Sequence, residues 1–170
     1  MNLFKGLPKL QELYAGHNVI TQLGGYADLG ALKRLHLRGN KIAQIGAGEE
    51  GADLPELPAL EYLNLRSNAL ENMDDVFKLF AFATLSDLNI INCPIELTFS
   101  SMNLMIAQTL IKASTLEQKH TSLKRYCKTD ITDVHRLEAV YLAKYEHGKA
   151  EEEAARKKAE EDAAAAAEEN

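Results

Sequence analysis

Cysteine is scarce in this chain: only Cys93 and Cys127 occur among its 170 residues. Two cysteines cannot supply the disulfide framework that stabilises small secreted domains. We therefore expect an intracellular, reducing compartment, and we interpret Cys93 as a structural side chain rather than a reactive thiol.

The sequence also lacks a long apolar run and an excess of basic residues. Neither the amino-terminal segment nor any later stretch reaches the roughly 18 apolar residues that a membrane span needs. The formal net charge of -6 argues against a general nucleic-acid-binding protein, which would normally show a basic face. We expect a cytoplasmic protein that has neither a membrane nor a nucleic acid as its partner.

Motifs for catalysis and metal binding are missing as well. The chain contains no nucleophile elbow, no glycine-rich phosphate loop, no HExxH and no CxxC. Its histidines do not have the spacing of metal ligands; they are His17, His36, His120, His135 and His147. The sequence therefore predicts a protein that is not an enzyme and has no catalytic residue, no cofactor and no metal site.

The chain does contain one pattern that occurs four times. The aligned positions are Leu7, Leu10, Leu13, Ala15, Asn18, Ile20 and Leu23; Leu29, Leu32, Leu35, Leu37, Asn40, Ile42 and Ile45; Leu57, Leu60, Leu63, Leu65, Asn68, Leu70 and Met73; and Phe82, Leu85, Leu88, Ile90, Cys93 and Ile95. This register matches LxxLxxLxLxx(N/C)xL, the leucine-rich-repeat pattern. One such unit cannot bury its own apolar face, so the units must stack. We therefore predict an α/β solenoid: a short leucine-rich-repeat horseshoe of about four repeats with a helical C-terminal cap and an extended charged helix.

Within each unit, the LxLxx segment predicts a short strand of a parallel sheet, because alternate side chains point inward. The Asn or Cys that follows turns the chain and can satisfy buried backbone groups of adjacent coils. We expect a structural ladder at these positions: Asn18, Asn40, Asn68 and Cys93.

The side chains between the buried leucines should form three rows on the concave face. The rows are Glu12, Arg34, Tyr62 and Asp87; Tyr14, His36, Asn64 and Asn89; and Gly16, Arg38, Arg66 and Ile91. Tyrosine and arginine mixed with neutral amides are typical of protein-binding surfaces. The alternative is a face that is merely solvated or packed by the protein's own tail. We predict a protein-binding site at Glu12, Tyr14, Arg34, His36, Arg38, Tyr62, Asn64, Arg66, Asp87 and Asn89.

Three further segments lie outside the repeat register. The glycine-rich, acidic insertion 46–53 predicts a mobile loop on the rim or convex side. Residues 74–80 open with carboxylates and have apolar residues at helical spacing, so we expect a convex helix there. Ser100 or Ser101 can cap a helix that seals the end of the solenoid. Its apolar stripe is expected at Met102, Met105, Ile106, Thr109, Leu110 and Ala113.

The C-terminal part begins with a strand-like turn at 123–126, after which Thr132 or Asp133 can cap another helix. The apolar stripe of that helix is Val134, Leu137, Tyr141 and Tyr145. From Lys149 the sequence is almost only Ala, Glu, Lys and Arg, which predicts a solvated helix. Its expected ion pairs, four residues apart, are Glu152 with Arg156 and Glu153 with Lys157.

These elements divide the chain into leucine-rich repeats at 1–97, a C-terminal cap at 98–131 and a charged helical extension at 132–170, rich in Ala, Glu and Lys from residue 149. Met1 precedes the first unit by only a few residues, so the coil of Leu7, Leu10 and Leu13 would be unshielded. We expect that a partner covers this edge or that the chain is not the whole gene product.

The short repeat register, the lack of cysteine caps and the block 122–132 together resemble the 22-residue subclass of intracellular leucine-rich-repeat proteins. That subclass includes a phosphatase-1 regulatory subunit, dynein light chain 1 and leucine-rich-repeat proteins of ciliary axonemes. In the axonemal members, a segment reading roughly Leu-Lys-Arg-(hydrophobic)-Asn-Lys-x-x-(hydrophobic)-Thr leads into a charged helix. Here Leu123 to Thr132 is similar to that segment, with Cys127 in the place of Asn.

The resemblance extends most closely to the leucine-rich-repeat subunits of the ciliary radial spoke. It implies a non-catalytic structural subunit of a hetero-oligomeric assembly in the axoneme of a cilium or flagellum, with other axonemal or radial-spoke proteins as its partners. The alternative is a regulatory leucine-rich-repeat subunit that binds a phosphatase or a dynein component reversibly.

Overall fold

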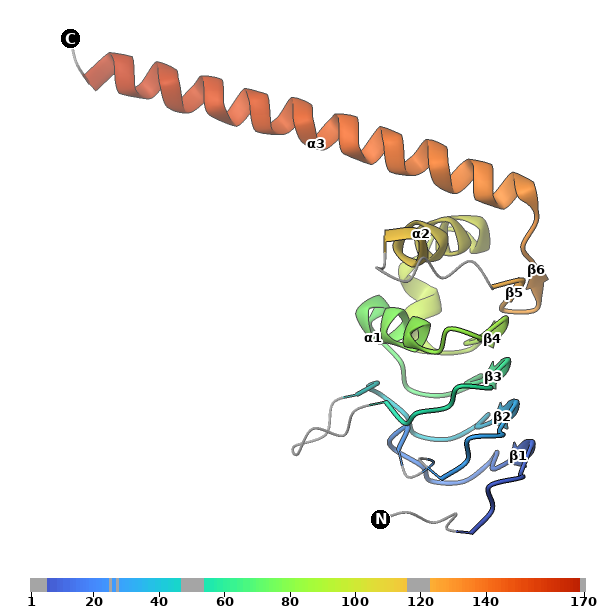
Figure 1. The fold of residues 1–170 in the computed structure, drawn as a ribbon. Helices are drawn as coiled ribbons and strands as arrows, with labels where there is room; N and C mark the ends of the chain where they lie inside the picture. Colours follow the sequence, from blue (N-terminus) through green and yellow to red (C-terminus); the bar gives the residue numbers. More distant parts are fainter. Residues whose placement is uncertain (1–5, 25, 27, 47–53, 116–122, 169–170) are drawn as a thin grey trace.

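The computed structural model describes residues 6–24, 26, 28–46, 54–115 and 123–168 (Figure 1). Its strands are β1 (Glu12–Tyr14), β2 (Arg34–His36), β3 (Tyr62–Asn64), β4 (Asp87–Asn89), β5 (Arg125–Tyr126) and β6 (Thr129–Asp130). Its helices are α1 (Met73–Lys78), α2 (Met102–Thr115) and α3 (Asp133–Glu168), with short 3-10 segments η1 (Leu79–Ala81) and η2 (Pro94–Thr98). Apart from Gly46, the loop expected at 46–53 lies outside the described residues.

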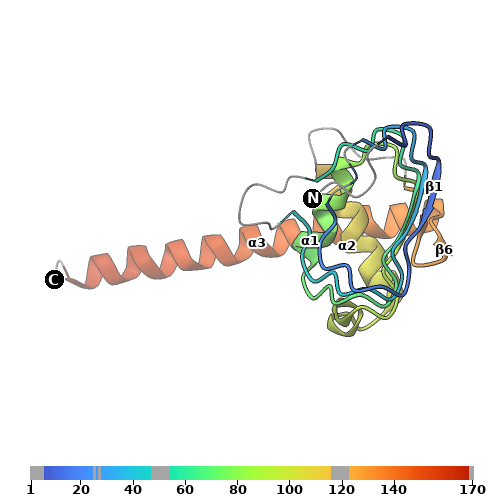
Figure 2. The ribbon, with the colours of Figure 1, turned by 90° about the horizontal axis from the view of Figure 1, so that it is seen from below.

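One sheet holds all six strands in their sequence order. Strands β1 to β5 are parallel, and β6 returns antiparallel to β5. The register pairs Leu13 with Leu35, Leu35 with Leu63, and Leu63 with Leu88, so equivalent leucines of the four units lie side by side. Figure 2 shows the strands along one side of an arc, with α1 and α2 on the opposite side. The predicted α/β leucine-rich-repeat architecture is therefore present.

The apolar core runs between the strands and the convex side. Leu35, Leu63 and Leu88 are fully buried, whereas Leu13 of the first unit is only partly buried and Leu7 is exposed. In the described chain the first coil is covered on one side only, by the second. Because burial of a leucine side chain stabilises by about 1.5–3 kcal/mol, the first coil contributes less to the core than its successors.

Asparagine amides join successive coils. Asn40 Nδ2 donates to the carbonyl oxygens of Ala15 at 3.0 Å and Leu37 at 2.8 Å, and its Oδ1 accepts from the Ile20 N–H at 3.0 Å. Asn68 makes the same three kinds of bond one coil later. Both amides are buried, and each satisfies backbone groups of its own coil and of the preceding one.

The two ends of this ladder differ from its middle. Asn18 is exposed, and its Nδ2 donates only within its own turn, to Ala15 O at 3.2 Å and Gly16 O at 3.1 Å. The described chain has no coil before Asn18 for the amide to reach. Cys93 is buried and its Sγ donates to Leu65 O at 3.4 Å, so the thiol spans two coils where the shorter side chain replaces Asn.

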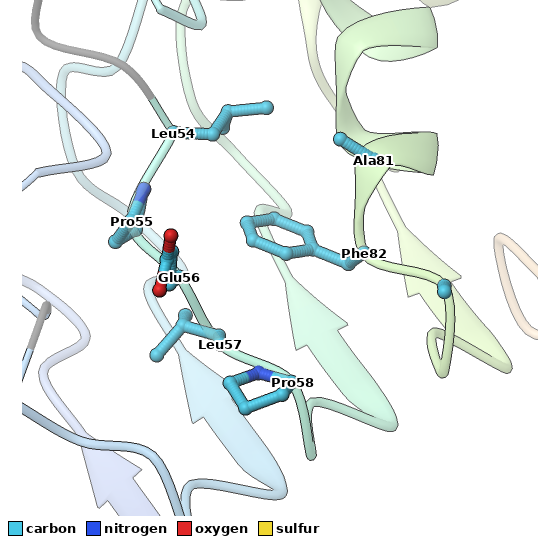
Figure 3. Close-up of a pocket in the computed structure, with 8 residues that line it drawn as sticks. Leu54, Pro55, Glu56, Leu57, Pro58, Ala81 and Phe82 are labelled. Carbon is cyan, nitrogen blue, oxygen red and sulfur yellow. The ribbon is translucent and has the colours of Figure 1, made fainter.

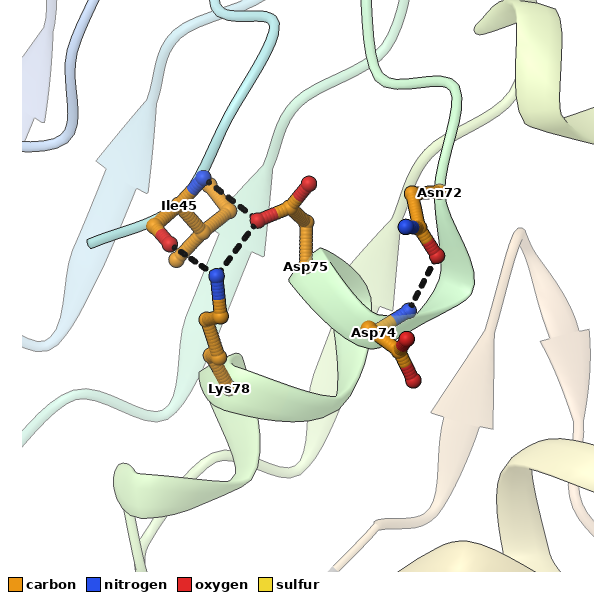
Figure 4. A network of polar contacts seen from close by, with 5 residues as sticks. All are labelled: Ile45, Asn72, Asp74, Asp75 and Lys78. Atoms are coloured by element: carbon orange, nitrogen blue, oxygen red, sulfur yellow. Dashed lines mark hydrogen bonds and ion pairs between the residues drawn. The ribbon is translucent and has the colours of Figure 1, made fainter. Parts of the chain in front are cut away.

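Helix α1, followed by η1, confirms the helix expected over residues 74–80. The carboxylate of buried Asp75 accepts from the Ile45 N–H at 3.1 Å and from Lys78 Nζ at 2.8 Å (Figure 4). Lys78 Nζ also donates to Ile45 O at 2.9 Å, and Asn72 caps the helix by accepting from Asp74 N at 2.9 Å. The two bonds to Ile45 attach the convex helix to the coil of the second unit.

Helix α2 begins one residue after Ser101, whose Oγ accepts from Leu104 N at 3.2 Å. Four members of its expected stripe are buried: Met105, Ile106, Thr109 and Leu110. Met102 packs against the core from a partly buried position, and the side chain of Ala113 lies outside the described part of the chain. The helix contacts both α1 and α3.

Helix α3 begins at Asp133, after a turn in which the Thr132 N–H donates to His135 Nδ1 at 3.1 Å. The apolar stripe expected on this helix does not pack against the body of the protein. Val134, Leu137, Tyr141 and Tyr145 are 56–68% exposed. Instead, Ala139 is 5% exposed and Leu142 packs against the core. The small side chain of Ala139 lets α3 approach α2 closely. The spacing of the larger apolar residues did not predict which side of α3 faces α2.

The C-terminal part of α3 extends away from the body of the protein (Figure 1), and residues 149–160 are exposed. Glu153 and Lys157 form the expected pair at 3.8 Å. Arg156 pairs at 3.5 Å with Glu160 rather than with Glu152, since the residue four positions later is equally within reach on this helix. None of the helices in the described ranges combines the length and the hydropathy that crossing a membrane takes.

Candidate protein-binding site on the concave sheet

The structure brings the predicted concave residues together on neighbouring strands. Register pairs align Glu12, Arg34, Tyr62 and Asp87 in a first row, and Tyr14, His36, Asn64 and Asn89 in a second. The third row lies just after the strands. Backbone hydrogen bonds between neighbouring coils, which the carbonyl oxygens of Arg38, Arg66 and Ile91 accept, keep its residues side by side. The leucine spacing therefore sets which side chains become neighbours.

An aromatic stack crosses the first three strands. The rings of Tyr14 and His36 lie 4.2 Å apart between centroids at 18°, and those of His36 and Tyr62 lie 4.8 Å apart at 36°. Arg34 places its guanidinium 4.4 Å from the centroid of the Tyr62 ring. Tyr14 is 69% exposed, so the stack presents broad, rigid side chains to the open side of the sheet.

His36 is the central ring of this stack, and it is partly buried. Burial lowers the pKa of His36, and the charge of Arg34 lowers it further. Its Nε2 is buried and has no hydrogen-bond partner among the described residues. The ring is therefore neutral at physiological pH and stacks as an aromatic group rather than acting as a charge.

The first row is largely neutralised by its own ion pairs. Arg34 lies 3.8 Å from Glu12, and Arg125 lies 3.7 Å from Asp87 and 2.7 Å from Asp130. Burial raises the pKa of Asp87, whereas the hydrogen bond to Asp130 raises the pKa of Arg125. The alternation of sign along the row leaves it with little net charge.

Arg125 and Asp130 extend the first row, and the sequence did not predict them as site residues. Arg125 pairs with Asp87 across β4 and β5, and with Asp130 across β5 and β6. A signal for them was present: the spacing from Leu123 to Tyr126 equals that from Leu85 to Leu88, with a tyrosine in the last position.

The two asparagines of the second row shape the backbone. Asn64 Oδ1 accepts from Arg66 N at 3.1 Å, and Asn89 Oδ1 accepts from Ile91 N at 3.1 Å. Asn89 is only 3% exposed, so it offers almost no surface to a partner. Both side chains fix the turn that positions the third row, and Arg66 depends directly on Asn64 for its position.

An open hollow of about 530 Å³ lies over the C-terminal half of this face. Its lining residues are Arg34, Arg38, Tyr62, Asn64, Arg66, Asp87, Asn89, Arg125 and Lys128. Seven of these were predicted as contact residues; Arg125 and Lys128 are additions from the strand pair β5 and β6. The lining is predominantly polar and charged.

A second hollow, of about 400 Å³, lies between the segments that precede β3 and β4 (Figure 3). Its lining residues are Leu54, Pro55, Glu56, Leu57, Pro58, Ala81, Phe82 and Ala83. Glu56 is the single ionisable residue of this lining. A set of apolar side chains with one carboxylate provides no converging groups for acid–base or nucleophilic chemistry.

The buried thiols do not provide a nucleophile either. Burial raises the pKa of Cys127 to about 12 and also raises the pKa of Cys93. The reactive form of cysteine is the thiolate, and a raised pKa disfavours that form. In the ranges that the structure describes, no three His, Cys, Asp or Glu side chains converge in a way that could hold a metal ion.

Comparison with solved structures identifies a similar chain in the crystal structure of the Drosophila melanogaster SNF/U2A′ complex. The TM-score is 0.62 at 22% sequence identity, over 79% of this chain and 69% of that chain. No protein-family model and no curated protein sequence matches the chain. At this level of identity the likeness concerns the fold alone, and it agrees with the repeat register and the parallel sheet: the chain has an α/β leucine-rich-repeat fold.

Proposed function

We propose that this chain is a non-catalytic docking subunit that binds other proteins through its concave sheet. The observation that carries the proposal is the stack of Tyr14, His36 and Tyr62 on three successive strands, with Arg34 over the last ring. Tyrosine and arginine are enriched at the positions that dominate the binding energy of protein interfaces, and aromatic rings lose little conformational freedom on binding. The similar solved structure is itself a complex, which supports a role of this fold in assembly.

We infer that the assembly is the cytoplasmic axoneme of a cilium or flagellum, in or near a radial spoke. Support comes from the sequence block Leu123 to Thr132 and the charged helix after it, which resemble axonemal leucine-rich-repeat subunits. The block forms β5 and β6, and Arg136 Nη2 attaches α3 to it by donating to Leu123 O at 2.8 Å. A stiff helix fixed to the end of a solenoid suits a structural subunit.

Two further surfaces of this short solenoid suit neighbours in a hetero-oligomer. We propose four repeats sealed by α2. Among the described coils, the one that carries β1 has a neighbouring coil on one side only. That coil exposes Leu7 and Val19. Helix α3 exposes Leu137 and Tyr141 on its side away from the body. Apolar side chains in these places would be covered in the assembled complex.

Substitution of four concave residues tests the docking role. The variant carries alanine at Tyr14, Arg38, Tyr62 and Arg66. The matched control carries alanine at exposed residues outside the concave rows and outside α3, namely Lys41, Gln44, Glu71 and Asp74. Tagged full chains are purified from ciliated cells, and co-purifying proteins are identified by mass spectrometry. We expect the concave variant to lose partners that the control retains; equal recovery would remove the basis of the docking proposal.

The same purification distinguishes the two forms of that role. Retention in salt-washed axonemes together with spoke components supports the structural subunit. A soluble complex with a phosphatase catalytic subunit or a dynein component, released at moderate salt, supports a reversible regulatory subunit instead. The fractions are compared before and after the salt wash.

A further inference from the structure

Charge is distributed unevenly over the concave sheet. The whole chain has a net charge of -6, yet five of the nine residues that line the large hollow are cationic and one is anionic. The cations are Arg34, Arg38, Arg66, Arg125 and Lys128, and the anion is Asp87. This basic surface on an acidic protein marks the hollow as a place for a ligand of negative charge.

The ion pairs divide the cations into two groups. Arg34 and Arg125 are held by carboxylates of the first row, as described above. Within the described residues, no carboxylate lies in ion-pair range of Arg38, Arg66 or Lys128. The unpaired cations therefore gather at the C-terminal ends of the strands and in the turn between β5 and β6.

A second feature of Arg66 also indicates a ligand of negative charge. Its Nε is buried, and it has no hydrogen-bond acceptor among the described residues. A buried N–H group without an acceptor is unfavourable, and an arginine fork is well matched to a carboxylate that accepts two parallel bonds. A carboxylate placed at Arg66 would satisfy this group and lie next to Arg38 on the neighbouring coil.

We propose that Arg38, Arg66 and Lys128 bind an acidic segment of a partner protein, an assignment that rests on the docking function proposed above. Adjacent strands of a sheet lie roughly 4.8 Å apart, and carboxylates three or four residues apart on a helix have Cβ atoms about 5–6 Å apart. Two carboxylates on one face of a helix therefore match the two guanidinium groups of adjacent coils. Lys128 adds a third cation at the side of the hollow.

The carboxylates of the first row favour a protein segment over a nucleic acid. Asp87 lines the same hollow, and Asp130 and Glu12 lie in the same row of the sheet. A polyphosphate chain across this face would bring its regular negative charges against these groups. A protein segment can place carboxylates on the third row and neutral or apolar side chains over Tyr62.

The test uses the full chain and a fluorescein-labelled 20-residue peptide of Ala and Glu, with Glu pairs four residues apart. A peptide with Gln in place of each Glu is the uncharged control. Affinity is measured by fluorescence anisotropy at 50 mM and 150 mM salt. We expect R38Q/R66Q to weaken binding of the acidic peptide at least tenfold, and R156Q/K158Q, which removes equal charge from α3, to change it less than twofold.

Circular dichroism verifies that each variant is folded. Because Arg66 is partly buried, R38Q/K128Q serves as a second variant in which both substituted side chains are exposed. The same weakening is expected for it. Equal loss in R156Q/K158Q would overturn the assignment, because binding would then follow net charge alone. Tighter, Arg38-dependent and Arg66-dependent binding of a 20-nucleotide single-stranded RNA would overturn it in favour of a nucleic acid.

The purification of partners from ciliated cells distinguishes a failure of the acidic-segment assignment from a failure of the docking function. If Y14A/Y62A loses the co-purified partners and R38Q/R66Q retains them, the docking function stands and the acidic-segment assignment is overturned. If neither pair of substitutions affects capture, the docking function itself fails. Loss with both pairs, together with the peptide result, supports both.

Discussion

Arg34 connects three strands of the concave sheet: its guanidinium lies 4.4 Å from the centroid of the Tyr62 ring on one side, and its Nε lies 3.8 Å from the Glu12 carboxylate on the other. The cation is thus held by a ring and a carboxylate, each from an adjacent strand. Such mutual restraint orders the side chains before any partner arrives, which lowers the entropic cost of binding.

Removal of the Tyr62 ring should weaken the fold as well as the docking surface. We expect Tyr62→Ala to lower the free energy of unfolding by about 1–3 kcal/mol, because the contacts with His36 and Arg34 are lost together with buried ring area. Urea denaturation measures the change. Tyr62→Phe keeps the ring and should differ from the parent by less than about 0.5 kcal/mol; a loss as large as that of the alanine variant would contradict the role given to the ring.

The asparagine ladder predicts unequal effects of one substitution at two places. Asn68→Ala leaves two carbonyl groups and one N–H without their amide partner in the buried interior, so we expect a loss of about 3 kcal/mol. Asn18→Ala removes bonds on an exposed turn and should cost less than about 1 kcal/mol. Equal midpoints in urea for the two variants would show that the bonds between coils do not stabilise the solenoid.

His36 should make the protein less stable in mild acid. Its pKa is lowered in the folded state, by burial first and by Arg34 second, so the unfolded chain binds a proton more readily. The free energy of unfolding therefore falls as the pH decreases through the ordinary histidine pKa of about 6.5. The groups that face His36 are Tyr14, Tyr62, Arg34 and Glu12.

Comparison with His36→Gln isolates this contribution. Thermal unfolding is followed from pH 7.5 to pH 5.0 for both proteins. The parent should lose more stability over this range than the variant, because titrating groups other than His36 are common to both. Parallel curves would mean that protonation of His36 is not coupled to folding.

The concave rows were predictable from the sequence because the leucine spacing fixes the register. Once Leu13, Leu35, Leu63 and Leu88 are aligned, the residues on either side of each leucine must lie in neighbouring rows. The leucine spacing does not predict how far each side chain of a row extends from the sheet into solvent. It therefore predicted Asn89 as a contact residue, although a hydrogen bond to its own turn keeps that amide buried.

The fifth and sixth strands were harder to predict. Their register depends on the position of Tyr126 opposite Leu88, after a long helical insertion that breaks the repeat spacing. The spacing of Leu123 and Tyr126 is the one signal that could have placed Arg125 beside Asp87. Only the fold shows that the turn containing Lys128 borders the same hollow. The repeat spacing is interrupted before β5, so it does not by itself predict which residues of β5, β6 and their turn lie beside the earlier strands.

Helix α3 permits a direct test of the misassigned stripe, with both changes made on the same helix. Leu137→Ser and Tyr141→Ser together should alter the free energy of unfolding by less than about 0.5 kcal/mol, because both side chains already contact solvent. Ala139→Leu introduces volume into the buried side of the helix and should cost about 1–3 kcal/mol. Urea denaturation of the three proteins measures both values. If the serine pair destabilised the chain by the several kcal/mol of a core substitution, the stripe would pack inside the protein, and its proposed role as a surface for neighbouring subunits would be lost.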